Sequence, residues 1–287
     1  MTVLSVCNHK GGTGKTTTAI HISAALGLSG RSILVIDLDP QGFLTRAMGF
    51  GEPAPSQSVA GFFESKHDPQ HIDPKSTQGF DLIPSSSVLT RRMRDLNKPT
   101  DVLWVREVLQ TIDLDYDVVL FDTAAALTVY SLNALVASEH VVIPVLPEYQ
   151  SIVGGEQTYQ TVQLVEDKLN PLLQSPHFVF TQVDARKRMH QTYREYIREK
   201  YGRLVLENEI RTSSSLAKSQ NGRTTVFDRD PNARGAVDYA NVTDELVGRM
   251  QAGAEVDEPV PEDLRTSAQA ASKNASDLRE ILSSQAN

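Results

Sequence analysis

The fold of this chain is decided by one stretch near its beginning, residues 2–29, which reads TVLSVCNHKGGTGKTTTAIHISAALGLS. The stretch opens with a short apolar and β-branched run, Thr2–Cys7, which is typical of a buried strand. Glycines follow at once, and the pattern from Lys15 to Ser29 is helical. The order strand, glycine-rich turn and helix predicts a phosphate-binding loop, because curled backbone N–H groups and a helix N-terminus converge on an anion.

Further apolar runs continue the alternation of strands and helices along the chain. They predict strands over Ser32–Asp37, Phe80–Pro84, Asp117–Asp122, His140–Val145 and His177–Val183. Helical patterns cover Val102–Ile112, Val129–Ala137, Ser151–Leu173, Met189–Tyr201 and Ala233–Met250. Uninterrupted apolar strands suit parallel pairing with both faces covered. We therefore expect an α/β fold, a doubly wound and mostly parallel sheet with helices on both faces.

Length and composition are those of an ordinary globular protein. The 287 residues, 40% hydrophobic and 22% charged, are enough for one large domain. We place this domain at residues 1–250 and expect an acidic flexible linker with a weakly helical tail at 251–287. Gly51–Ser58 is interpreted as a surface loop.

The single cysteine, Cys7, excludes an internal disulfide and a cysteine-rich metal site. No apolar run approaches the roughly 20 residues that span a bilayer. Because the first strand starts at Thr2, we expect a cytoplasmic protein without a signal peptide.

The phosphate-binding loop departs from the standard motif at one position. GxxxxGK[ST] needs glycine at residue 9, where this chain has His9, but Gly14-Lys15-Thr16 is intact. We expect Lys15 to reach the β- and γ-phosphates of ATP and the Thr16 hydroxyl to bind Mg²⁺, with Thr17 near the α-phosphate. The alternative, a glycine-rich turn with an exposed lysine, is disfavoured by the flanking strand and helix. The expected ATP-binding residues are Lys10, Gly11, Gly12, Thr13, Gly14, Lys15, Thr16 and Thr17.

Two carboxylate-bearing segments follow later strands, at the edge where an α/β sheet presents its ligand-binding loops. Residues 37–42 read DLDPQG, and residues 118–122 read VVLFD, an apolar strand that ends in a carboxylate. The second segment is a Walker B pattern, so we expect Asp122 to bind Mg²⁺ through water. Each segment alone is a weak signal, since Asp39 could simply cap a helix. Together with the loop, in this order and spacing, they predict one nucleotide site.

Residues 10–17, KGGTGKTT, resemble the deviant Walker A motif of the ParA/MinD family of P-loop NTPases. The resemblance implies that Lys10 is the family's signature lysine, which crosses a dimer interface to the nucleotide of the partner subunit. It also implies that Asp39 orients the attacking water and that Asp37 helps to organise Mg²⁺. Taken alone, Lys10 could equally be a solvated loop lysine. The expected catalytic residues are thus Lys10, Lys15 and Asp39, and the expected Mg²⁺ residues are Thr16, Asp37 and Asp122.

The resemblance covers roughly residues 2–250. It includes PVLPEY at 144–149, the stretch 210–223 and DRDPNARGA at 228–236, and it places adenine near Gln182 and Ile210–Thr212. The chain departs from the family after Asp122-Thr123, where Ala124-Ala125 replace the usual Pro-Pro. Loss of two prolines should make this loop more flexible. No glutamate follows Asp122 directly, which suits a slow switch better than a fast motor; our hypothesis is a slow, partner-stimulated ATPase.

The charge distribution bears on DNA binding. A net charge of −8 argues against a globally basic nucleic-acid binder, but seven basic residues against two acidic ones lie between Arg186 and Arg203. With the resemblance, this cluster predicts non-specific binding to DNA phosphates. The alternative is a solvated helix whose Glu195 and Glu199 make surface ion pairs. The candidate DNA-binding residues are Lys187, Arg188, Arg194, Arg198, Lys200, Arg203, Arg211, Lys218 and Arg223.

The resulting hypothesis is a ParA/Soj-like ATPase that dimerises on ATP, binds the nucleoid and positions plasmid DNA, chromosomal DNA or another large cargo. A ParB-like or cargo-adaptor protein would stimulate its hydrolysis. Because the loop begins at residue 10, we expect no preceding helix-turn-helix domain and no operator binding. One alternative is a MinD-like membrane-associated regulator, which the alanine-rich, weakly amphipathic Asp263–Leu282 disfavours. The other is a metabolic P-loop enzyme, which Lys10 and DLDPQG disfavour.

Overall fold

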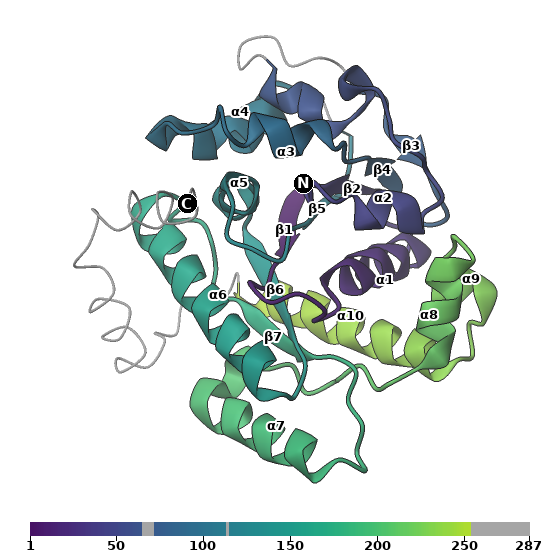
Figure 1. Ribbon diagram of the computed structural model, residues 1–287. Coiled ribbons are helices and arrows are strands. Elements are labelled where there is room, and N and C mark those ends of the chain that lie inside the picture. Colours follow the sequence, from purple (N-terminus) through teal and green to yellow (C-terminus); the bar gives the residue numbers. More distant parts are fainter. Residues whose placement is uncertain (65–71, 113–114, 254–287) are drawn as a thin grey trace.

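The computed structural model of the chain describes residues 1–64, 72–112 and 115–253 (Figure 1). Its centre is a seven-stranded sheet in the order β3-β4-β2-β5-β1-β6-β7. Neighbouring strands pair in parallel, except that β3 runs antiparallel to β4 at one edge. The expected doubly wound, mostly parallel sheet is confirmed. The strands are β1 (Thr2–Val6), β2 (Ile33–Asp37), β3 (Lys75–Ser76), β4 (Asp81–Ile83), β5 (Val118–Asp122), β6 (His140–Val145) and β7 (His177–Phe180).

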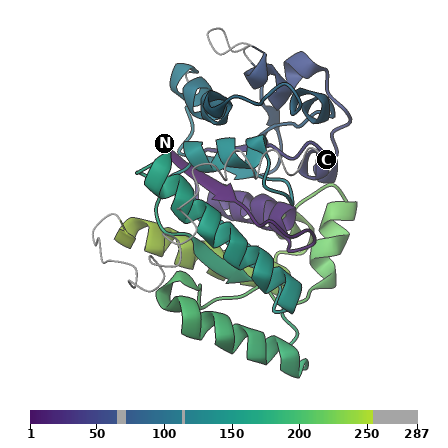
Figure 2. The ribbon, with the colours of Figure 1, turned by 60° about the vertical axis from the view of Figure 1, so that its left-hand side comes forward.

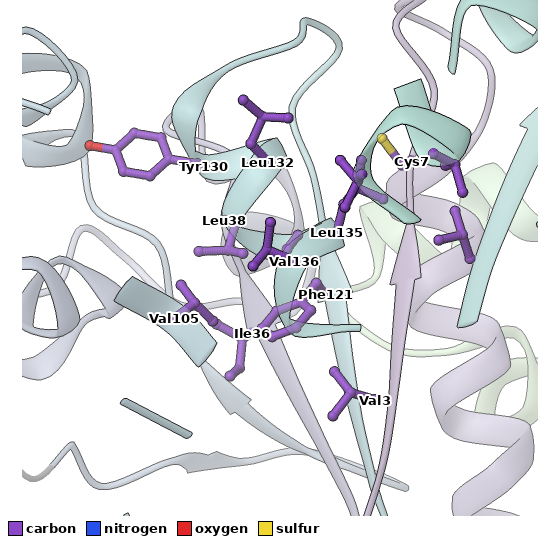
Figure 3. Close-up of a cluster of buried hydrophobic side chains, with 14 of the residues drawn as sticks. Val3, Cys7, Ile36, Leu38, Val105, Phe121, Tyr130, Leu132, Leu135 and Val136 are labelled. Atoms are coloured by element: carbon purple, nitrogen blue, oxygen red, sulfur yellow. The ribbon is translucent and has the colours of Figure 1, made fainter. Parts of the chain in front are cut away.

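Helices cover both faces of the sheet (Figures 1 and 2). Successive strand residues point to opposite faces. Val3 of β1 therefore belongs to the apolar cluster shared with α4, α5 and α6, whereas Leu4 belongs to the cluster shared with α1 and α10. Figure 3 shows part of the first cluster, with Val105 of α4 and Leu132 of α5. The helices are α1 (Lys15–Leu28), α2 (Phe43–Ala47), α3 (Val88–Arg92), α4 (Trp104–Thr111), α5 (Val129–Ala137), α6 (Tyr149–Lys168), α7 (Arg188–Tyr201), α8 (Ser214–Asn221), α9 (Val226–Arg229) and α10 (Arg234–Gly253).

Two element ends differ from the sequence prediction for identifiable reasons. The helix expected to reach Leu173 ends at Lys168, because Pro171 cannot continue it. The strand expected to reach Val183 ends at Phe180, and Gln182 then has φ 53°, in the left-handed region that interrupts an extended chain. The short helices α2, α3, α8 and α9 were not predicted, because four to eight residues carry little periodic signal.

The C-terminal boundary is also slightly displaced. Helix α10 continues to Gly253, three residues beyond the boundary placed after residue 250. The rest of the predicted linker and tail, 254–287, lies outside the described residues. Among the helices of the described part of the chain, none is both long enough and apolar enough to cross a membrane.

Helix α1 is joined to the C-terminal helices by its own polar side chains. His21 is fully buried; its Nδ1 lies 2.7 Å from the Thr17 carbonyl oxygen and its Nε2 accepts the Val226 N–H at 3.1 Å. Its ring stacks on Tyr239 of α10 with 4.9 Å between centroids, and the Tyr239 hydroxyl lies 3.2 Å from Thr18 Oγ1. A neutral ring protonated on Nδ1 satisfies both contacts. Burial lowers the pKa of His21 from 6.5 to about 4.

We expect the acid sensitivity of the fold to depend on His21. Since its folded-state pKa lies below 6.5, the unfolded chain binds more protons between pH 6.5 and about 4. The free energy of unfolding therefore falls as the pH falls through this window, by up to about 1.4 kcal/mol per pH unit for this group. His21→Gln should show a shallower decline, measured by urea unfolding at several pH values. Parallel curves for the two proteins would contradict the assignment, since all other titrations are shared.

Candidate nucleotide-binding site

The glycine-rich loop lies between the end of β1 and the start of α1, as predicted. Gly12 and Gly14 have φ values of 80° and 88°, which side chains other than hydrogen rarely allow. Gly14 is the N-cap of α1, and no side chain caps this end of the helix. The first N–H groups of α1 therefore remain available to an anion.

The two lysines of the loop are in opposite situations. Lys15 is only 6% exposed, and its ammonium donates to the Lys10 carbonyl oxygen at 3.0 Å. Burial lowers the pKa of Lys15, while neighbouring Asp122 opposes this shift. Lys10 is exposed, and its ammonium makes no hydrogen bond or ion pair with the described residues. The loop thus carries one buried cation and one exposed cation.

Asp122 lies at the centre of the site. It pairs in register with Val6 of β1 and Asp37 of β2, so the carboxyl ends of three adjacent strands meet here. Its Oδ2 accepts the Thr16 hydroxyl at 2.8 Å, whereas its buried Oδ1 has no hydrogen-bond partner among the described residues. Burial, and then the neighbouring Asp37, raise the pKa of Asp122 well above its usual range.

The DLDPQG segment is held by α2. Both the N–H and the hydroxyl of Thr45 donate to Asp37 Oδ2, at 2.9 and 2.7 Å, and the Asp39 N–H donates to Asp37 Oδ1 at 3.1 Å. Despite these bonds, burial raises the pKa of Asp37 to about 7. Asp39 is 8% exposed, and its Oδ1 accepts the Gln41 N–H at 2.9 Å. Asp37 therefore positions the loop that carries Asp39.

These groups fit a magnesium ion. Thr16 and Asp122 supply a hydroxyl and a carboxylate side by side, and the unpartnered Oδ1 of Asp122 would accept a water bound to the ion. Within the described residues, no three His, Cys, Asp or Glu side chains form a metal site of their own. Mg²⁺ would thus take most of its remaining ligands from phosphate and water, as it commonly does.

Two residues that follow β7 hold the loop in place, a role that the sequence alone did not indicate. Thr181, after β7, donates from its hydroxyl to the Thr13 carbonyl oxygen at 2.8 Å. The amide of Gln182 donates to the Gly12 carbonyl oxygen at 3.1 Å, which brings the segment expected near adenine to the loop. Single threonines and glutamines carry no motif, and only their positions after β7 could have indicated this role.

Helix α6 also packs closely on the first half of the loop. The His9 N–H donates to the Thr158 hydroxyl at 3.0 Å. A Cβ built on Gly154 would lie 2.7 Å from Lys10 Cβ and 3.0 Å from Asn8 Oδ1. Any side chain here would therefore push the loop away from the helix.

We expect Gly154→Ala to destabilise the protein by about 1–3 kcal/mol, because the Lys10 backbone must shift. Gly248→Ala is the matched control, since a Cβ there meets nothing within 4 Å and lies on an exposed part of α10. The control should be as stable as the wild type or up to about 1 kcal/mol more stable. Urea unfolding measures both. Equal stability of the two variants would show that the loop tolerates the methyl group.

The loop after β5 contacts the glycine-rich loop. Thr123 donates from its hydroxyl to the Val6 carbonyl oxygen at 2.8 Å. A Cβ on Gly11 would lie 3.7 Å from Ala125 Cβ, an ordinary contact distance. Ala125 therefore lies beside the phosphate-binding loop.

Several predicted DNA-binding cations lie against carboxylates. Arg194 Nη2 is 2.8 Å from Glu209 Oε2, and Lys200 Nζ is 2.6 Å from Glu156 Oε1. Arg211 pairs with Asp238 of α10. Two longer contacts join Arg198 to Glu209 (3.8 Å) and Lys187 to Glu148 (3.9 Å).

The paired arginines line a hollow of about 340 Å³. Three arginines and three carboxylates meet in it, so its charge is balanced: Arg194, Arg198, Arg211, Glu207, Glu209 and Asp238. By contrast, Arg188, Lys218 and Arg223 are exposed and make no ion pair with the part of the chain that the structure describes. The Arg203 carbonyl accepts from Arg249.

Comparison with known proteins identifies the family. Residues 1–175 match the family AAA_31, described as an AAA domain. The sporulation initiation inhibitor protein Soj of Bacillus subtilis is 31% identical over 251 residues, covering 85% of this chain and 97% of Soj. The chain belongs to the ParA/Soj family of P-loop ATPases.

Two solved structures that are similar to this ParA/Soj-type chain contain nucleotide and magnesium. Cobyrinic acid a,c-diamide synthase from Mycobacterium smegmatis, with bound ATP analogue and magnesium, is 28% identical with a TM-score of 0.74, covering 91% of this chain and 98% of that one. MinD from Pyrococcus horikoshii, complexed with Mg-ADP, shares the fold at 17% identity and a TM-score of 0.66, covering 90% and 99%. The solved structure at 28% identity thus contains the two kinds of ligand, an ATP analogue and magnesium, that the sequence predicts for this site.

Proposed function

We propose that this chain is a dimerising ATPase of the ParA type, which binds non-specific DNA in its ATP state and positions plasmid, chromosome or another large cargo. The observation that carries the proposal is the pair of loop lysines. Lys15 is buried within its own loop, whereas the ammonium of Lys10 is exposed and has no partner among the described residues. A second subunit facing the loop would give Lys10 a phosphate to contact.

The residues of the site have distinct roles in this proposal. Lys15 would leave the Lys10 carbonyl for the β- and γ-phosphates, and Thr16 with Asp122 would hold Mg²⁺. The ion supplies charge stabilisation at the transferring phosphoryl group. Asp39 would orient the attacking water, and Lys10 from the partner would neutralise charge in the transition state. ATP occupancy and dimerisation are then one coupled equilibrium.

We assign DNA contact first to the exposed cations that lack an ion pair within the described residues, Arg188, Lys218 and Arg223. A cation that is already paired with a carboxylate gains less free energy by binding a phosphate, because its existing partner must be displaced. The proposal therefore ranks the predicted set: Arg194, Lys200 and Arg211 contribute less than the three unpaired residues.

The proposal is tested by the retention of a non-specific DNA duplex at low salt with ATP and Mg²⁺, compared with ADP. We expect retention with ATP only. Arg223→Ala should weaken binding and reduce the slope of log K against log salt by about 1. Arg194→Ala is the matched control and should change the slope less. No retention by the wild type with ATP would exclude DNA binding, and equal effects of the two variants would exclude the ranking.

The same protein preparation can be used to test the MinD-like alternative. Sedimentation with anionic liposomes, with ATP and with ADP, should leave the protein in the supernatant. ATP-dependent sedimentation without DNA retention would favour a membrane-associated regulator instead. A ParB-like or adaptor protein, added to the DNA-bound protein, should increase ATP hydrolysis and release the DNA.

A further inference from the structure

A hydrogen bond joins the nucleotide loop to α8 across 203 residues of sequence. Gln220 Nε2, in the last turn of α8, donates to Thr17 Oγ1 in the first turn of α1 at 2.8 Å. Both side chains are part-buried. Shortly after α8, Arg223 is in the left-handed region with φ 57°, and its side chain packs against Gly49.

The Thr17 hydroxyl can accept the hydrogen bond from Gln220 and at the same time donate one to a ligand. A hydroxyl has one donor hydrogen and two acceptor lone pairs. Gln220 occupies a lone pair, so the hydroxyl hydrogen remains free to be donated, and within the described residues it has no acceptor. An oxygen of a nucleotide phosphate, bound at the loop that starts α1, would accept this hydrogen. A chain of two hydrogen bonds in the same direction strengthens both.

The rest of α8 is fixed from the other side. Its Leu216 packs on the first turn of α10, where a Cβ on Gly235 would lie 2.7 Å from Leu216 Cγ. Ser219 is fully buried and bonds to the Leu216 carbonyl oxygen at 2.8 Å. The end of α8 that carries Gln220 therefore faces the nucleotide loop, while Lys218 on the same helix is exposed.

We propose that Gln220 is a positioning residue for the nucleotide, which acts through the Thr17 hydroxyl and makes the end of α8 respond to phosphate binding. The inference rests on the proposed placement of the nucleotide at the loop. It also gives a physical route from the nucleotide to Lys218 and Arg223, through one side chain rather than through a movement of the whole sheet.

Gln220→Glu provides the sharpest variant, because glutamate keeps the shape of glutamine but its carboxylate cannot donate. The Thr17 hydroxyl would then donate to the introduced carboxylate in place of the phosphate. We expect the dissociation constant for Mg-ADP, measured by calorimetry, to rise about fivefold in Gln220→Ala and further in Gln220→Glu. Because the introduced carboxylate would also repel the phosphate, the neutral variant decides: if Gln220→Ala bound Mg-ADP as tightly as the wild type, the proposal would be wrong.

A double-mutant cycle shows whether Gln220 acts through Thr17. Thr17→Val removes the hydroxyl and keeps the shape of the side chain. In that background Gln220→Ala should weaken Mg-ADP binding no further, whereas independent effects that multiply would overturn the proposal. Thr17→Ser should restore most of the affinity.

Amide hydrogen exchange provides a readout apart from affinity. In the wild type, saturating Mg-ADP should increase protection of residues 218–226, and in Gln220→Glu it should not. Loss of protection equally with and without nucleotide would indicate a structural role only. If the wild type does not bind Mg-ADP, the nucleotide site itself is wrong. If it binds and the Gln220 variants bind equally well, this inference alone fails.

Discussion

Replacing Lys10 with alanine should leave a protein that binds ATP but does not dimerise on it, with ATP hydrolysis reduced by about 10³-fold or more. This is the range seen when a cation supplied across an interface is lost from phosphoryl transfer. ATP binding by the monomer should persist, because Lys15, the buried lysine of the loop, is unchanged. Light scattering with a non-hydrolysable ATP analogue measures the dimer, and phosphate release measures hydrolysis.

Lys168→Ala is a suitable control for this experiment. Lys168 is an exposed lysine in the last turn of α6, where its ammonium lies 2.7 Å from Asp167. Its loss should change neither dimerisation nor hydrolysis. A Lys10→Ala protein that still dimerised on the analogue would show that Lys10 is only a solvated loop residue, and the proposed function would lose its main support.

Asp39→Asn should have the opposite effect on the dimer. The amide keeps an oxygen for the Gln41 N–H but cannot orient and activate water as a carboxylate does. Hydrolysis should fall by about 10²–10⁴-fold while ATP binding is retained. Because the ATP state then persists, dimer and DNA complex should accumulate. Phosphate release and DNA retention on the same sample measure the two effects.

Asp115→Asn, at an exposed position outside the site, serves as the control for charge and expression. Its hydrolysis should match the wild type. If Asp39→Asn hydrolysed ATP at the wild-type rate, Asp39 would have only its local bond to Gln41 as a role. Another group would then have to orient the water.

The sequence predicted the sheet well because its strands are buried on both faces. The runs that became β1, β2, β5 and β6 are mostly apolar, so the sequence indicated their type and their bounds. Elements whose positions depend on contacts with distant residues could not be predicted in this way. Helix α8 has eight residues and mixed polarity, and α9 has four. Their positions are set by contacts with α1, which lies more than 200 residues earlier in the chain.

The site was predictable where a motif fixes chemistry and spacing together. Lys15, Thr16 and Asp122 converge as expected, since strand pairing brings the carboxyl ends of β1 and β5 together. The motif did not indicate which hydrogen bonds and ion pairs each side chain forms. Asp37 accepts a hydrogen bond from the Thr45 hydroxyl of α2, and several of the predicted DNA-binding arginines form ion pairs with carboxylates. Such pairings depend on three-dimensional proximity, which charge counts along the sequence do not contain.

The adjacent carboxyl groups of Asp37 and Asp122 have a practical consequence for handling the protein. Asp37 has a pKa of about 7 in the fold against 3.8 ordinarily, so the fold binds more protons than the unfolded chain between these values. Its contribution to the free energy of unfolding declines as the pH rises from about 4 to about 7. Alkaline buffers that contain a chelator therefore leave two adjacent negative charges without Mg²⁺ to offset them. We expect the protein to be most stable during purification and frozen storage near neutral pH, with magnesium and ADP present throughout.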